Sequence, residues 1–373
     1  MRHDLASLAF PALPTLPTLS IAGRAAPRRS LRTRAAHDLE DAGPWDAFAG
    51  PVAAFRQLMA DADRQAARNG GRVSDDHAER IRSACNALAR TLNDRVGDRA
   101  RLSDEQRRDF EARIRAELMP CIARSALGRR ICTKPRGYAG DFLTIAIMYE
   151  DEAGGVGHSG EILDRAIRDQ PACSAVKNRR GILADEIARS RAESNAPVTR
   201  VTSLACGPAA ELFDVFVALE DPESLQATCI DIDDQAIDFV ANRCDERGLR
   251  DRFALHNRNL VHLTAGRQQL DLEPQDLIYS IGLIDYFGDR FVVRLLDYVH
   301  GLLAPGGRAL FGNFHVDNPS KALMDHVLDW KLVHRTEADM HRLFEASAFG
   351  RRCTSIRFED AGVNMFAECI KTA

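Results

Sequence analysis

Residues 200–211 read RVTSLACGPAAE, an apolar strand pattern that ends in a turn around Gly207. A second apolar stretch, residues 227–233, reads ATCIDID and ends in carboxylates. A strand, a tight Gly turn, a helix and a second strand ending in an acid are the parts with which a doubly wound α/β sheet holds an adenosine-containing ligand, because the acid accepts hydrogen bonds from the ribose hydroxyls. The two stretches therefore predict an α/β fold that binds a nucleotide-type cofactor.

The turn in residues 205–210, ACGPAA, has a single glycine. A dinucleotide fold requires G-x-G-x-x-G, which lets the backbone approach a pyrophosphate, and a P-loop requires G-x-x-x-x-G-K-[ST]. Neither pattern is present here. An NAD-dependent oxidoreductase stays open as an alternative, but the single glycine counts against it.

From Ala205 onward the turn resembles the cofactor motif of class I methyltransferases, which use S-adenosyl-L-methionine (SAM). The resemblance implies that Ala205 and Gly207 pass close to the methionine part and the ribose of SAM. It also implies that Asp231 lies under the ribose, with Ile232 beside it in the cofactor site. The expected fold is a Rossmann-like, doubly wound class I methyltransferase sheet preceded by an N-terminal α-helical domain.

Two later stretches continue this pattern in order. Residues 256–260, HNRNL, follow a short apolar run, and the resemblance places Asn259, with Leu260 next to it, against the adenine amino group. Residues 276–282, DLIYSIG, predict a fourth strand that is buried on both faces, because its apolar residues run almost without alternation. We expect the end of that strand, with Ser280 and Gly282, to open onto the cofactor. Residues 302–308, LLAPGGR, predict a structural turn before a fifth strand.

Length and composition are those of a globular enzyme with two units. The chain has 373 residues, of which 45% are hydrophobic and 28% charged, enough for one large α/β domain and a smaller unit. It has no apolar run long enough to span a membrane. Its nine cysteines show no C-x-x-C spacing and its histidines no H-E-x-x-H, so reduced cytoplasmic thiols and no bound metal are expected. We interpret Cys206 as a small buried hydrophobe rather than a nucleophile.

Charge is distributed unevenly along the chain. Residues 1–36 contain six Arg and one Asp, whereas the whole chain has a net charge of −4. Residues 1–40 therefore read as a flexible, basic, proline-broken leader before an acidic body. An acidic body disfavours nucleic acid as a substrate, since phosphates require a basic face. A small-molecule acceptor is expected instead.

Residues 41–172 predict a helical domain ahead of a methyltransferase domain over residues 173–373. Apolar residues recur at helical spacing in three segments, and Ser103 with Gln106 forms a capping box before the third. The three segments are residues 51–59, 81–92 and 110–122. These helices carry no catalytic pattern, and we expect them to form a lid or the contact of a homodimer.

Residues 133–142, TKPRGYAGDF, concentrate Gly, Pro, basic residues and a Tyr in one loop. The loop resembles one found ahead of the methyltransferase core in bacterial proteins for biosynthesis of 3-hydroxypalmitic acid methyl ester. Three later stretches, residues 285–286, 312–314 and 329–336, are similar to the same group, so that the resemblance covers roughly residues 130–373. It implies SAM-dependent O-methylation of a fatty or hydroxy acid carboxylate. An N- or S-methyltransferase of an amino-acid-like or natural-product substrate and a non-catalytic SAM-binding sensor are the alternatives.

The residue types of this loop predict that it contacts SAM. We expect it to close over the sulfonium, with Tyr138 packing on or hydrogen-bonding to the cofactor and Asp141 either capping the next helix or holding the cofactor's amino group. The alternative is a joining turn in which Arg136 forms an ion pair with the acidic body. Arg179 is a candidate for the methionine carboxylate, although a solvated basic helix face fits its sequence context equally well.

Methyl transfer from a sulfonium depends on holding the acceptor in line with the methyl group and on excluding water. A carboxylate acceptor needs only hydrogen-bond donors for orientation, whereas an amine or hydroxyl also needs a base. The candidates for these tasks follow the ends of the predicted strands or lie in the loop: Tyr138, Asp285, Tyr286, Asn313, His315 and Arg335.

Overall fold

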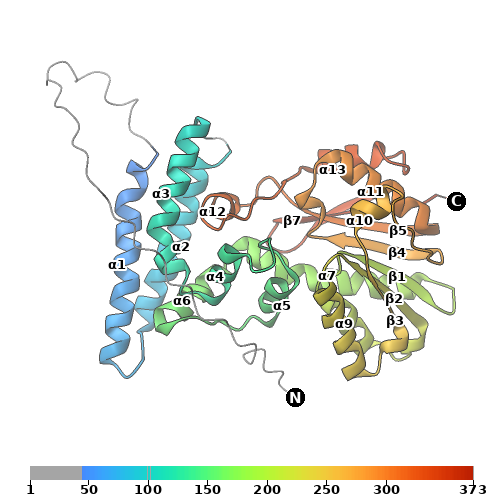
Figure 1. Cartoon of the computed structure of the whole chain (residues 1–373), viewed down its shortest axis with the longest axis horizontal. Coiled ribbons are helices and arrows are strands. Elements are labelled where there is room, and N and C mark those ends of the chain that lie inside the picture. The colour runs from blue at the N-terminus through green and yellow to red at the C-terminus, as the bar shows by residue number, and fades with distance from the viewer. Residues whose placement is uncertain (1–43, 99, 101, 373) are drawn as a thin grey trace. The chain divides into compact units, whose positions relative to one another are not determined.

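The computed structural model describes residues 44–98, 100 and 102–372, so the predicted leader lies outside the described residues. Residues Gly43–Ala373 form one compact unit. It contains a seven-stranded sheet in the order β3-β2-β1-β4-β5-β7-β6 (Figure 1). The first five strands in the chain run parallel, and β7 runs antiparallel to both β5 and β6. The strands are β1 (Thr199–Leu204), β2 (Leu225–Asp231), β3 (Phe253–Asn257), β4 (Gln275–Ile281), β5 (Leu303–Phe314), β6 (Ser355–Phe358) and β7 (Asn364–Ile370).

Two hydrophobic cores cover the two faces of this sheet. Helices α7 (Pro171–Glu193), α8 (Ala210–Ala218) and α9 (Asp234–Arg247) supply one core. Helices α10 (Leu260–Thr264), α11 (Asp289–Leu302) and α13 (Glu337–Glu345) supply the other. Burial on both faces explains the nearly continuous apolar character of the central strands. The α/β prediction and the fourth strand are confirmed.

The chain order reverses between β1 and β4, because β2 and β3 lie on one side of β1 while β4 and β5 lie on the other. In an open α/β sheet, ligands bind in the crevice at the carboxyl ends of the strands beside such a reversal.

One local prediction differs from the structure. The turn expected at Pro305–Gly307 lies within β5, where Leu303 pairs with Gln275 and Arg308 pairs with Leu277, so the extra residues form an irregularity in the strand.

The segment before the sheet is helical, with α1 (Asp46–Arg68), α2 (Asp75–Val96), α3 (Asp104–Ile122), α4 (Ala126–Thr133), α5 (Phe142–Glu150) and α6 (Gly157–Arg168). Helices α1 to α3 contain the three predicted helical segments and lie side by side (Figure 1). Both halves of the predicted capping box are present, because Ser103 accepts from the backbone of Gln106 and the Gln106 side chain accepts from the backbone of Ser103.

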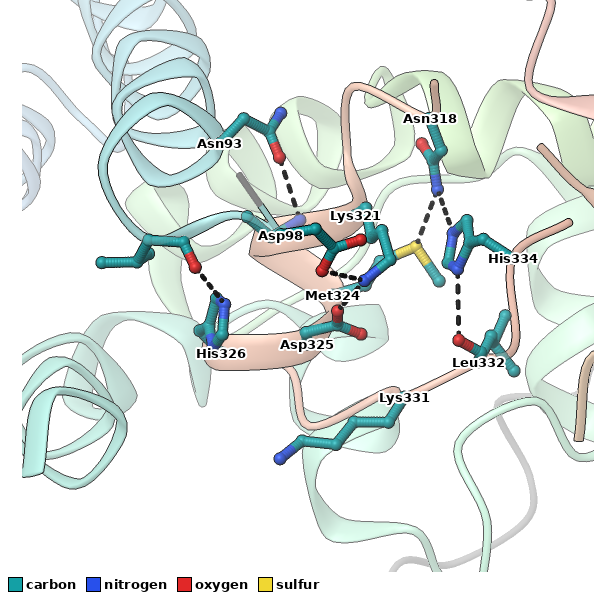
Figure 2. Close-up of polar contacts among 12 residues, drawn as sticks. Asn93, Asp98, Asn318, Lys321, Met324, Asp325, His326, Lys331, Leu332 and His334 are labelled. Carbon is teal, nitrogen blue, oxygen red and sulfur yellow. Dashed lines mark hydrogen bonds and ion pairs between the residues drawn. The ribbon is translucent and has the colours of Figure 1, made fainter. Parts of the chain in front are cut away.

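A short helix that follows β5, α12 (Lys321–His326), attaches to these N-terminal helices (Figure 2). The backbone N–H of Ala322 donates to Asn93 of α2 at 3.0 Å. The ring of His326 lies between Glu111, 2.8 Å from Nδ1, and the carbonyl of Val96, 3.0 Å from Nε2. These contacts join α12 to α2 and α3. The hydrophobic core of the helices correspondingly includes Leu323, Met324, Val327, Leu328 and Trp330.

Replacing Gly181 with Ala should stabilise the protein. Gly181 is an exposed residue in the interior of α7, and a Cβ added there would clash with no neighbouring side chain. Alanine loses less conformational freedom than glycine when a helix forms, so we expect the free energy of unfolding to rise by about 0.5–1 kcal/mol. Urea denaturation monitored by circular dichroism measures the change, and a lower midpoint in the variant would contradict it.

Candidate active site

A cavity of about 250 Å³ opens at the carboxyl ends of β1, β2 and β4. The turn after β1 and the first residues after β2 and β4 form one side of it, and α7 contributes Val176, Arg179 and Leu183. The opposite side comes from distant segments: Tyr138, Gly140 and Phe142 of the 133–142 loop and, from beyond β5, Trp330 and Leu332. The cavity thus lies where the strand order reverses, and the 133–142 loop forms part of its wall.

The turn after β1 is more tightly curved than its glycine content predicts. Ala205, Gly207 and Ala209 all have positive φ, at 52°, 52° and 47°. For alanine this left-handed conformation costs roughly 1–2 kcal/mol per residue, and such strain is kept where the surrounding structure enforces it. Three alternating positions of the turn therefore have the backbone conformation that favours glycine, although only Gly207 is a glycine.

Asp231, the last residue of β2, is fixed to this turn. Its Oδ2 accepts from the N–H of Gly207 at 2.9 Å, and its Oδ1 accepts from the N–H of Asp233 at 2.9 Å. Burial raises the pKa of Asp231 more than these backbone hydrogen bonds lower it. The carboxylate and the neighbouring Ile232, which is 63% exposed, both line the cavity.

Arg179 of α7 brings a buried positive charge to the same cavity, since the residue is only 7% exposed. Its Nε donates to the Tyr149 hydroxyl at 3.3 Å, the only hydrogen bond that Arg179 makes within the described part of the chain. Burial lowers the pKa of the guanidinium, but Tyr149, Asp285 and Glu211 outweigh this effect and raise it. The result is a permanent cation whose remaining N–H donors have no protein acceptor among the described residues.

Gly282, directly after β4, makes room for this side chain. A Cβ at position 282 would lie 2.8 Å from Nη1 of Arg179, and Gly282 also has a φ of 80°. Any larger residue would displace the guanidinium. Gly282 lines the cavity after the fourth strand, and its lack of a side chain leaves room for Arg179.

Two buried carboxyl groups face the cavity close to Arg179. Glu211 of α8 accepts from the Tyr279 hydroxyl at 2.9 Å, and burial raises its pKa. Oδ1 of Asp285 accepts from the N–H of Phe314 at 2.7 Å, and burial raises the pKa of Asp285 from 3.8 to about 6. The cavity thus combines one guanidinium with several acidic groups.

Aromatic side chains close the cavity opposite the sheet. The rings of Tyr138 and Tyr286 meet edge to face with their centres 6.1 Å apart, and Nε1 of Trp330 donates to the Tyr286 hydroxyl at 2.9 Å. A Cβ at Gly140 would lie 2.6 Å from the Tyr286 oxygen, so only glycine fits there. Burial raises the pKa of Tyr286 to about 12 and raises that of Tyr138 further. Both phenols are therefore neutral near pH 7 and can donate hydrogen bonds.

The loop that carries Tyr138 is held at both ends. Arg136 forms an ion pair with Asp233, with Nε 2.6 Å from Oδ2, which is the contact expected of a joining turn. Asp141 caps α5 and pairs with Arg130 at 2.6 Å. Of the two roles weighed for Asp141, the structure thus shows the capping one. The loop is anchored as a joining turn would be, and it also lines the cavity.

Three predicted cofactor residues lie beside the cavity and do not line it. Asn259 caps α10 by accepting from the N–H of Val261 at 2.8 Å, while Leu260 belongs to the core on that face of the sheet. The buried hydroxyl of Ser280 donates to the carbonyl of Leu204 at 2.9 Å. Their side chains serve the turns around the cavity in this structure.

Three predicted catalytic residues that lie near or beyond the end of β5 also stand outside the cavity lining. The guanidinium of Arg335 donates to the carbonyls of Ile284 and Phe287 at 2.9 and 2.6 Å and to Oδ1 of Asn313 at 2.7 Å, and it pairs with Asp289. His315 lies 3.1 Å from Glu337. Arg335, together with Asn313, thus braces the segment that carries Asp285 and Tyr286, whereas His315 is held by Glu337.

Several lining residues have no counterpart in the sequence prediction. Glu211 ends the opening stretch and Trp330 lies in one of the stretches noted for resemblance, but neither was assigned a role. Tyr149 lies on a helix face with no chemical pattern. Only the fold brings these side chains to Arg179 and Tyr286.

Comparison with protein-family models and with curated proteins found no match. Among solved structures, 81% of this chain aligns with all of a possible exported protein from Bordetella parapertussis, at 20% identity and a TM-score of 0.55. The SAM-dependent methyltransferase SibL aligns with 89% of this chain and 99% of its own, at 18% identity and a TM-score of 0.46. The N-methyltransferase NodS from Bradyrhizobium japonicum WM9 aligns with 55% of this chain and 99% of its own, at 16% identity and a TM-score of 0.38.

The chain has the fold of the class I methyltransferases. The sheet order and the antiparallel seventh strand decide this, and the predicted fold class is confirmed. Among the described residues, no helix is both long and apolar enough to cross a membrane. The same residues contain no group of three or more His, Cys, Asp or Glu side chains suited to a metal ion.

Asp285→Asn should change how stability depends on pH. Because the pKa of Asp285 is raised to about 6 in the folded protein, the folded state binds more protons than the unfolded state between pH 4 and 6. Wild-type stability should then fall as the pH rises through this window, by up to about 3 kcal/mol. The Asn variant lacks this loss, so we expect it to be more stable than wild type at pH 8 and to converge with it near pH 4. Urea denaturation across this range measures the difference, and parallel profiles would contradict the expectation.

Proposed function

We propose that this protein is a SAM-dependent methyltransferase of a small-molecule acceptor, and that the acceptor is the carboxylate of a fatty or hydroxy acid. The observation that carries the cofactor assignment is Arg179, a buried cation with open donors in a cavity that also holds Asp231, Glu211 and Asp285. SAM, when bound, supplies a methyl group on a positively charged sulfur. Its carboxylate, its two positive charges and its ribose hydroxyls match these four side chains.

Each residue then has a defined task. Arg179 binds the methionine carboxylate through its free N–H groups, as guanidinium–carboxylate pairs do. Asp231 accepts from the ribose hydroxyls, and the exposed Ile232 packs on the adenine. Glu211 and Asp285 place negative charge in the part of the cavity that receives the ammonium and sulfonium groups. Asn259 remains our proposal for the adenine amino group.

The Tyr286 hydroxyl favours a substrate that is methylated on an oxygen atom. Its oxygen accepts a hydrogen bond from Nε1 of Trp330, and its O–H proton has no acceptor among the described residues. The phenol can therefore donate that proton to a ligand in the cavity. Tyr286 therefore donates, and together with Tyr138 it can orient a carboxylate, which is already a nucleophile at neutral pH.

Asp285 supports a second candidate function, methylation of a hydroxyl or amine. With a pKa of about 6 it is ionised at neutral pH, and it lines the cavity. Its carboxylate could remove a proton from such an acceptor. Asp285→Asn separates the two functions: transfer to a carboxylate should fall less than about fivefold, whereas transfer that needs a base should fall at least about 100-fold.

The experiment that tests the proposed function combines binding with product analysis. Calorimetry with SAM measures the cofactor, and tritiated SAM with straight-chain acids, hydroxy acids, amines and thiols measures the acceptor. Methyl esters from the acids support the proposal. Binding of SAM without any transfer identifies the non-catalytic sensor, and binding of NAD in place of SAM identifies the oxidoreductase.

Tyr138→Ala should lower turnover by at least about tenfold, which corresponds to about 1.4 kcal/mol in the transition state. The ring forms part of the cavity wall next to Tyr286, and its loss admits water to the transferring methyl group. The melting temperature should change little, because the side chain is 37% exposed. Steady-state kinetics and thermal melting measure both quantities. A variant that melts early and keeps its turnover would identify the loop as purely structural.

We also propose a division of labour along the chain. Residues 41–172 act as a helical cap and residues 173–373 as the methyltransferase domain, with a homodimer as the proposed assembly. All nine cysteines are free thiols, which suits the proposed cytoplasmic location.

A further inference from the structure

A second cavity borders the active-site cavity, and we call it the vestibule. Its volume is about 230 Å³, close to the 250 Å³ of the active-site cavity. Tyr138, Tyr286 and Trp330 line both spaces, so these aromatic side chains form a shared wall. The vestibule is open to solvent, since the side chains of Asp329 and Lys331, which also line it, are 43% and 57% exposed. An acceptor held at Tyr286 therefore has the vestibule as room for its remaining atoms.

Two segments that lie far apart in the sequence meet in the vestibule. The 133–142 loop contributes Lys134, and the 329–336 stretch contributes Asp329 and Lys331. Nζ of Lys134 lies 2.6 Å from Oδ2 of Asp329, and this ion pair joins residues 195 positions apart. Neither lysine lines the active-site cavity, so both charges act on the vestibule.

The backbone that carries this ion pair has an unfavourable conformation. Lys134 and Asp329 have positive φ, 46° and 53°, which residues other than glycine disfavour. Residues held in this way cluster at ligand sites, where the surrounding structure enforces them. The position of both charged groups at the vestibule is thus maintained against a local cost.

Two cations share the carboxylate of Asp329. Its Oδ2 pairs with Lys134, and its Oδ1 accepts from Nη2 of Arg115 at 3.0 Å. One carboxylate balances only one of these two charges. The vestibule therefore keeps positive charge beside Lys134.

Lys331 adds a cation that is only weakly held. Its Nζ lies 3.3 Å from Oε2 of Glu111, which also lies 3.9 Å from Nη2 of Arg115, while Oε1 of Glu111 contacts His326 at 2.8 Å. The three Lys and Arg cations of this cluster thus face two carboxylates. Exposed ion pairs contribute little to stability, so an anionic ligand can take the place of a protein partner.

We propose that the acceptor is a dicarboxylic acid whose methylated carboxylate lies beside Tyr286 and whose second carboxylate lies in the vestibule, paired with Lys134 and Lys331. This inference rests on the proposed function and adds a requirement for a second negative charge. An oxygen of the first carboxylate takes the methyl group while the bond from that group to sulfur breaks, which gives S-adenosylhomocysteine and a neutral ester. The second carboxylate keeps its charge, so the product is a monoester.

Lys331→Met and Lys134→Met test the two lysines. Each should lower kcat/KM for diacids by about tenfold or more, because a charge-assisted hydrogen bond is lost. The values for monoacids with the same number of carbons should stay within about twofold of wild type, because these acids place no charge in the vestibule. The series runs from succinate to sebacate, and mass spectrometry distinguishes monoester from diester. SAM affinity should be unchanged in both variants.

Lys177→Met is the matched control. Lys177 pairs with Asp151 at 3.0 Å and has the same side-chain exposure as Lys134, 26%, but it lines neither cavity. Its removal should leave the preference for diacids intact. Lys331→Glu should reverse the charge preference, so that aminocaproate becomes a better acceptor than adipate. Folded lysine variants that keep the wild-type preference for diacids overturn the proposal, as does a wild type that uses both series equally well.

A second measurement uses the unmodified protein and does not depend on turnover. Acetic anhydride labels the lysines, and mass spectrometry follows each site in the presence of adipate or hexanoate. Adipate should protect Lys134 and Lys331, hexanoate should protect neither, and Lys177 should be labelled equally throughout. Methylation of monoacids without protection by any diacid rejects the vestibule site and keeps the proposed function. Protection by diacids without methyl transfer keeps the site and rejects the proposed function, so the two failures are distinguishable.

Discussion

Replacing Arg179 with Met should weaken SAM binding by about 30- to 150-fold, which corresponds to about 2–3 kcal/mol. The guanidinium is buried and lacks a carboxylate partner among the residues described, and the charges of Asp285 and Glu211 raise its pKa. Methionine keeps most of the apolar volume of the side chain and removes the charge. The carboxylate of the cofactor would then be held in the cavity without its cation, while the acidic side chains repel it.

Arg180→Met is the matched control. Arg180 is the next residue on α7, but its Nε and Nη2 donate to Asp214 at 2.6 Å each, and it does not line the cavity. Calorimetry of both variants with SAM and with S-adenosylhomocysteine measures the affinities, and urea denaturation shows that each variant is folded. Equal affinities for the two folded variants would remove Arg179 from the cofactor site.

Asp231→Ala should weaken SAM binding by about 1.5–3 kcal/mol, roughly 10- to 150-fold, because a charge-assisted hydrogen bond to the ribose is lost. The carboxylate also holds the N–H groups of Gly207 and Asp233, so the turn after β1 loses an anchor in the same variant. Asp276→Ala is a suitable control, since Asp276 lies near the start of β4 and accepts from the backbone of Arg200 instead.

A cofactor analogue separates the two effects of this substitution. S-Adenosylhomocysteine without its ribose 2′-hydroxyl should bind wild type more weakly than the parent compound does. In Asp231→Ala the two ligands should bind alike, because the group that distinguishes them is absent. A discrimination that persists in the variant would assign the ribose contact to another residue.

The central sheet and its cofactor edge were predictable because their signals are local. The strands β1, β2 and β4 are short and mostly buried, Gly207 marks a turn, and Asp231 ends a strand. The contact between Asp231 and the N–H of Gly207 joins the two stretches from which the prediction started. Chain order alone places these groups together once a parallel sheet is assumed.

Other parts of the site depend on tertiary context. Counting glycines cannot reveal that Ala205 and Ala209 adopt positive φ, because packing enforces a conformation that alanine disfavours. Arg335 was expected at the cavity as a clamp because it lies in residues 329–336, one of the stretches similar to the resembled group. Its hydrogen bonds to Ile284 and Phe287 arise from a loop about fifty residues earlier, and no local pattern indicates that pairing.

The attachment of α12 to the N-terminal helices has a consequence for how the protein is made. The core of α1 to α3 is completed by residues 322–330, including Leu323, Met324 and Trp330. A ribosome synthesises the helices first and this segment much later, after β1 to β5 have emerged. Until then the helices expose the apolar surface that the segment will cover, and such surface favours aggregation during synthesis. Helices α1 to α3, which are synthesised before the sheet, are thus completed after it, and a fragment that stops after α7 would lack part of its own interior.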